Sequence, residues 1–191
     1  MPTPPPLPSG EIIAATVRWI ERAVIGLNLC PFARQVHAEQ RIRYVVTDAG
    51  TPEALVDALV EELDFLAAAA PTAVETTLLI HPRVFDDFLD YNDFLDVADA
   101  AVEQMGLAGE IQVASFHPRY QFADTTADAI ENCTNRSPWP MLHLLREESV
   151  ERAVQAYPDT DRIYERNIET LRRLGRDGWE KLGAGNAGDD Q

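Results

Sequence analysis

Residues 75–82 read ETTLLIHP, and residues 111–118 read IQVASFHP. In both stretches a short apolar run, which predicts a strand, is followed at once by a His-Pro pair. A third run, IRYVV at residues 42–46, has the same strand character and precedes both. The sequence therefore predicts three strands, two of which end in the same dipeptide.

Amphipathic helices are predicted before the first strand and between the strands. Apolar residues that recur every three or four positions mark them at about 11–28, 51–70 and 84–105. Thr51 and Pro52 are typical of a helix start, and Gly106 is typical of a helix end. The buried stripe of the second helix is expected to consist of Leu55, Leu59, Leu63 and Leu66.

The alternation of strands and helices favours βαβ units and a parallel sheet. After the third strand, residues 117–141 contain three prolines and no sustained periodicity, which predicts a long loop. Two more helices are predicted at 142–156 and 159–174. The expected fold class is therefore α/β, with a βαβαβ parallel core, an N-terminal helix and two C-terminal helices.

The domain boundaries follow from composition at the two ends. Residues 1–10 form a Pro-rich tail, residues 11–174 a single α/β domain, and residues 175–191 a flexible acidic tail. The amino terminus has no secretory signal, so we expect a cytoplasmic protein with free thiols. No apolar run is long enough to cross a membrane.

The charge of the chain narrows the possible partners. The 191 residues include 32 acids and 16 bases, which gives a formal net charge of −16. Such an acidic chain is a poor general nucleic-acid binder, because that binding starts with neutralising phosphates. Two cysteines cannot make a disulfide scaffold. We therefore expect no nucleic-acid and no membrane partner, whereas the oligomeric state cannot be predicted.

His81 and His117 each follow a predicted strand directly. If the strands are parallel, both histidines lie at the edge where open α/β sheets bind ligands, and Asp48 holds the matching position after the first strand. We expect His81 and His117 to be acid/base groups or metal ligands, with Cys30 as nucleophile or third ligand. The structural alternative is that each ring caps a strand and hydrogen-bonds a loop carbonyl.

Polar groups in the long loop suggest a substrate-binding role. Arginine presents a planar fork that suits carboxylate or phosphate. The alternative is that the arginines pair with the abundant acids nearby. The residues expected to bind substrate are Asn132, Asn135, Arg136 and Ser137 in the loop, and His143 and Arg146 on the helix after it.

Five short motifs between residues 29 and 138 occur in the order of a known bacterial family, and the resemblance spans about residues 11–174. They are LCPFA (29–33), IHP (80–82), YNDFL (91–95), SFHP (115–118) and NRSP (135–138). In these motifs the chain resembles the uncharacterised family catalogued as domain of unknown function 1415. The resemblance implies no particular activity, cofactor or catalytic residue. The family often has an aromatic residue at the position of Cys133, which weakens the case for that thiol.

Three functional hypotheses follow. The leading one is a small enzyme, a hydrolase or transferase, that acts on an anionic small molecule at a Cys/His/Asn/Arg site. Its cofactor is unknown, and a divalent metal is one candidate. The second is a non-catalytic adaptor that binds a basic partner through the acidic helix at 84–105. The third is a thiol redox protein that uses Cys30 and Cys133.

Overall fold

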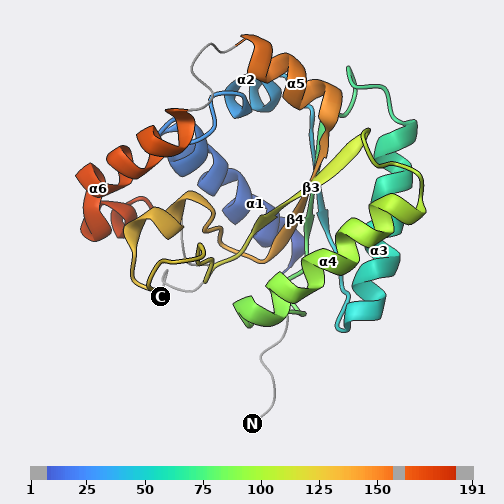
Figure 1. The fold of residues 1–191 in the computed structure, drawn as a ribbon, viewed down its shortest axis with the longest axis horizontal. Coiled ribbons are helices and arrows are strands. Elements are labelled where there is room, and N and C mark those ends of the chain that lie inside the picture. Colours follow the sequence, from blue (N-terminus) through green and yellow to red (C-terminus); the bar gives the residue numbers. More distant parts are fainter. Residues whose placement is uncertain (1–7, 157–161, 184–191) are drawn as a thin grey trace.

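The computed structural model describes residues 8–156 and 162–183. Helices cover both faces of a four-stranded sheet (Figure 1). The elements are α1 (Ser9–Trp19), the π-helix η1 (Ile20–Ile25), α2 (Ala33–Ala38), β1 (Ile42–Val46), α3 (Pro52–Ala68), β2 (Thr76–Ile80), α4 (Phe88–Gln104), β3 (Ile111–Phe116), the 3-10 helix η2 (Ile130–Thr134), β4 (Met141–Arg146), α5 (Glu147–Ala156) and α6 (Ile163–Lys181).

The sheet is mixed, with the strand order β1-β2-β4-β3. β1 and β2 are parallel, and β4 is antiparallel to both of its neighbours, β2 and β3. The three predicted strands therefore run in the same direction, and the α/β class with helices at both ends of the chain is confirmed. The structure adds one strand that was not predicted, β4, which lies between β2 and β3.

The fourth strand corrects the prediction of a helix over 142–156. Residues 141–146 are extended, and the helix α5 begins only at Glu147. The leucines and the arginine of this run have good helix propensity, but tertiary context routinely overrides propensity. Here the backbone is paired on both sides, with β2 and with β3.

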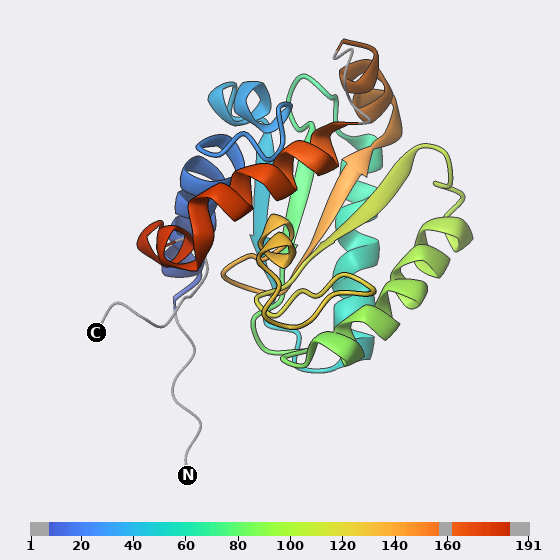
Figure 2. The same cartoon turned by 60° about the vertical axis from the view of Figure 1, so that its left-hand side comes forward.

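Two apolar clusters hold the helices on the sheet. α3 and α4 pack on one face, and α1, η1 and α6 pack on the other (Figure 2). The predicted stripe of α3 is confirmed, because all four of its leucines are fully buried. Thr51 also caps α3 as expected, since its side chain accepts a hydrogen bond from the Ala54 N–H.

The N-terminal helix ends in a π-helical turn. The Leu29 N–H bonds the Val24 carbonyl, and the chain then leaves the helix with Asn28 at φ 54°. A Cβ at Gly26 would clash with the backbone of Arg22, so glycine is required there. α2, which follows, was not predicted.

The carboxyl-terminal boundary also differs from the prediction. α6 continues to Lys181, with a break at Gly175. Trp179 is only 7% exposed and belongs to the cluster beneath α1 and α6. Residues 175–181 are therefore part of the packed domain and not of a tail. The Pro-rich tail predicted at 1–10 overlaps α1, which begins at Ser9. The remaining parts of the two predicted tails, residues 1–7 and 184–191, lie outside the described residues.

In the part of the chain that the structure describes, no helix is both long and apolar enough to cross a membrane.

Candidate functional site

The two strand-end histidines lie together, as their positions predict. Ile80 of β2 and Phe116 of β3 both pair with Met141, so the two histidines flank the start of β4. The ring of Tyr91 lies against both, with ring centroids 5.6 Å from His81 and 5.1 Å from His117. The hydroxyl of Tyr91 donates to the Met141 carbonyl over 2.8 Å.

Both histidine rings are closed off from solvent and bonded to backbone. His81 Nδ1 lies 3.1 Å from the Val84 carbonyl oxygen, and His117 Nε2 lies 3.0 Å from that of Phe85. The side chains are 0% and 1% exposed. Burial lowers the pKa of His81 to about 4 and also lowers that of His117. Both rings are therefore neutral at pH 7, as in the structural alternative.

Cys30 lies on the other side of the sheet from the histidine pair. Its neighbours Leu29 and Ala33 pack in the cluster beneath α1, whereas His81 packs against Tyr91 of α4. Burial raises the pKa of the Cys30 thiol, although hydrogen bonds from Phe32 and Ala33 oppose the effect. A thiol of raised pKa is a weak nucleophile at neutral pH.

Among the described residues, no three His, Cys, Asp or Glu side chains are grouped so that they could hold a metal ion. Asp48 lies near the carboxyl edge as expected, where its exposed carboxylate is 3.3 Å from Arg83. The structure therefore brings His81 and His117 together but leaves Cys30 outside that site.

The loop residues expected to bind substrate form hydrogen bonds within the loop or, for Asn135, to Ser115 of β3. Asn132 accepts from Phe122 N and Thr125 Oγ1 and donates to the Thr126 carbonyl. Arg136 donates to the carbonyls of two loop residues, and Asn135 and Ser137 also donate to backbone oxygens. These bonds give residues 120–140 their shape. Substrate binding by the four side chains stays a prediction that none of these contacts supports.

His143 and Arg146 lie on β4 and not on a helix. His143 Nε2 is 2.7 Å from Thr76 Oγ1, and burial lowers the pKa of the ring to about 4. Arg146 donates to the carbonyls of Leu66 and Ala69, where α3 ends, and to that of Val74 just before β2. Its guanidinium thus satisfies helix-end carbonyls that would otherwise be orphans.

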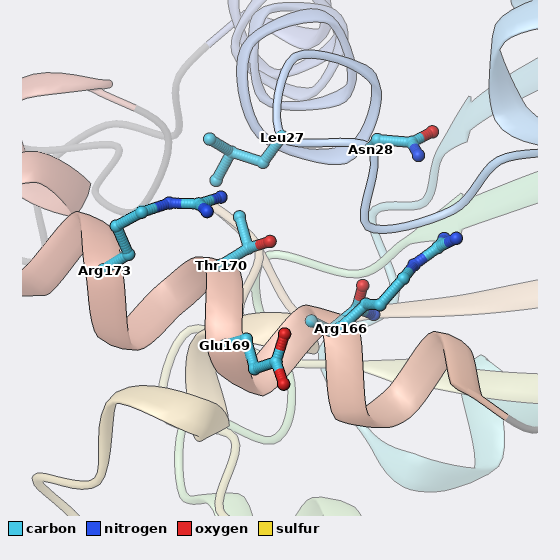
Figure 3. Close-up of a pocket in the computed structure, with 7 residues that line it drawn as sticks. Leu27, Asn28, Arg166, Glu169, Thr170 and Arg173 are labelled. Carbon is cyan, nitrogen blue, oxygen red and sulfur yellow. The ribbon is translucent and has the colours of Figure 1, made fainter.

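A pocket of about 230 Å³ lies between the end of η1 and the helix α6. Leu27 and Asn28 form one wall, and α6 forms the other (Figure 3). The α6 wall consists of Arg166, Asn167, Glu169, Thr170 and Arg173. The volume is below the usual range for drug-sized ligands, about 300–1,000 Å³, and suits a small metabolite.

Hydrogen bonding fixes the wall opposite α6. Asn167 is buried, and its Nδ2 donates to the Leu29 carbonyl over 3.0 Å. This bond joins α6 to the turn that carries Asn28. The π-helix η1 comes directly before this turn and determines its position. Such π-bulges are frequent at functional sites. The pocket is therefore a built feature of the packed domain.

The arginines of α6 divide between two sides of the helix. Arg172 and Arg176 pair with Glu131 and Asp128 of the long loop, at 3.1 and 3.2 Å. Arg166 and Arg173 line the pocket. They are seven residues apart, which places them on one face about 10.5 Å apart along the axis. Figure 3 shows the head of Arg173 turned toward Leu27 and that of Arg166 toward Asn28.

Sequence reasoning missed this pocket. The signal within reach was the seven-residue spacing of the two arginines in a predicted helix. Asn28 is 138 residues before Arg166, so only the fold shows that the two face one another.

The molecule is thus a mixed α/β domain with a polar, arginine-lined pocket outside its sheet. Residues 11–181 match the family model described as "Protein of unknown function (DUF1415)", and the chain belongs to that family. No curated protein and no solved structure matches the chain significantly.

Proposed function

We propose that this protein binds a small anionic molecule in the pocket between η1 and α6. One observation supports the proposal above all: two arginines, Arg166 and Arg173, line the same pocket in a chain of net charge −16. The net negative charge of the protein repels anions. Two arginines in one pocket provide the local positive charge that can attract an anion there.

Two neutral residues of the lining suit the same ligand. Guanidinium groups donate to carboxylate or phosphate in a planar fork. The Asn28 side chain and the Thr170 hydroxyl add neutral hydrogen-bonding groups around them. Among residues 8–156 and 162–183, no carboxylate forms an ion pair with the Arg173 guanidinium.

The proposal keeps the anionic ligand of the leading sequence hypothesis and moves its site. The buried, neutral histidine pair offers such a ligand no cationic contact. An enzymatic reaction is not part of the proposal, since Cys30 and the histidines lie on opposite faces of the sheet. Both cysteines are free, which fits the cytoplasmic location that we also propose.

Titration calorimetry with two probes, inorganic phosphate and glutarate, tests the proposal. We expect saturable binding of at least one probe by the full chain. Arg173→Gln should weaken that binding about tenfold, because a charge-assisted contact contributes about 1.5 kcal/mol or more. Arg166→Gln should act in the same direction.

Arg18→Gln is the matched control, because Arg18 is an exposed arginine of α1 that does not line the pocket. It should bind the probe as the wild type does. Equal loss in Arg18→Gln and Arg173→Gln would reveal a general charge effect and overturn the proposal, and so would the failure of both probes to bind.

A further inference from the structure

Two side chains of opposite charge line the pocket without forming an ion pair, although their spacing on α6 would allow one. Glu169 lies four residues before Arg173 on α6, which is the favourable orientation for an ion pair along a helix. Both side chains line the pocket, yet within the described residues no ion pair of either one is found. Figure 3 shows the Glu169 carboxylate and the Arg173 guanidinium turned to different parts of the lining.

From this separation we infer that the ligand is a zwitterion, with an anionic group on Arg173 and an ammonium group on Glu169. The inference rests on the proposed function, because it specifies the ligand of the same pocket. A purely anionic ligand would meet a repelling carboxylate at Glu169. A ligand that also has an ammonium group turns that repulsion into an ion pair.

The geometry suits a short ligand. The two side chains come from successive turns of one helix, about 6 Å apart along its axis. Both side chains line the pocket together with Leu27 and Asn28, and its volume of about 230 Å³ suits a molecule of amino-acid size. The expected class is therefore a small amino acid, or an amine with a carboxylate or phosphate group.

Glutamate and glutarate are matched probes, because they differ only in the α-ammonium group. We expect the full chain to bind glutamate about two- to fivefold more tightly than glutarate, the range of a partly exposed ion pair. Glu169→Gln should remove this preference by weakening glutamate binding and leaving or improving glutarate binding. Titration calorimetry at pH 7 gives both dissociation constants.

Glu180→Gln is the control, since Glu180 is an exposed acid of α6 that does not line the pocket. It should keep the wild-type preference. Equal affinities for the two probes, or a preference that survives Glu169→Gln, would overturn the zwitterion while the anion pocket stands. If phosphate, glutarate and glutamate all fail to bind, the proposed function itself fails.

Discussion

His81 and His143 are two buried rings that the folded protein holds without charge. Burial lowers the pKa of each to about 4, whereas an unfolded histidine titrates near about 6.5. The unfolded chain therefore binds more protons between these two values. Each ring contributes stability that is fully present above about pH 6.5 and is lost as the pH falls toward 4.

The expected loss is about 2 kcal/mol per histidine between pH 7.5 and pH 5. Urea unfolding at the two pH values measures it. In His81→Gln and His143→Gln, this pH-dependent difference should shrink by about that amount, even if the variants are less stable at every pH. If a variant shows the same pH-dependent loss of stability as the wild type, the replaced histidine does not take up its proton preferentially in the unfolded chain.

At the scale of the elements, the sequence predicts the strands and helices whose formation depends on a local pattern of residues. β3 spans residues 111–116, as expected, and α3 begins at the Thr51-Pro52 signal. β4 could not be predicted, because its residues favour a helix and only pairing with β2 and β3 extends them. α2 has no buried residue, so it leaves no apolar stripe in the sequence.

Arg146 of β4 connects that strand to the end of α3. Its guanidinium donates to three carbonyls, those of Leu66, Ala69 and Val74. We expect Arg146→Lys to lower the free energy of unfolding by about 2 kcal/mol, because an ammonium group cannot reproduce the fork and leaves carbonyls unpaired.

The matched control is Arg152→Lys. Arg152 is exposed on α5 and pairs with Glu148 over 3.4 Å and with Glu75 over 3.9 Å. Because lysine keeps the charge, its replacement should change stability by less than about 0.5 kcal/mol. Urea unfolding of both variants measures the difference. Equal stabilities of the two variants would mean that the carbonyls at the end of α3 find other partners without Arg146.

At the scale of the whole molecule, the sequence predicts which residues meet at the ends of neighbouring strands. It does not predict which residues meet between helices that are distant in the chain. His81 and His117 could be placed together because each ends a strand of the same direction. Cys30 could not be placed, because sequence spacing does not say which face of a sheet a connection crosses. The pocket depends on α6 returning to Asn28, which no local pattern encodes.

The return of α6 also extends the domain beyond its predicted end. Trp179 lies past Gly175, where the helix breaks, and it packs in the same cluster as Trp19 and Leu171. We expect Trp179→Ala to lower the free energy of unfolding by about 3 kcal/mol or more, because a large buried ring leaves a cavity. Guanidinium unfolding of the full chain, followed by far-UV circular dichroism, measures this loss.

Leu182→Ala is the control, since Leu182 is only partly buried beside the cluster and its replacement should cost less. If Trp179→Ala were no less stable than Leu182→Ala, the ring would not be packed in solution. Residues 175–181 would then form a tail, and α6 would be held against η1 by its first turns alone.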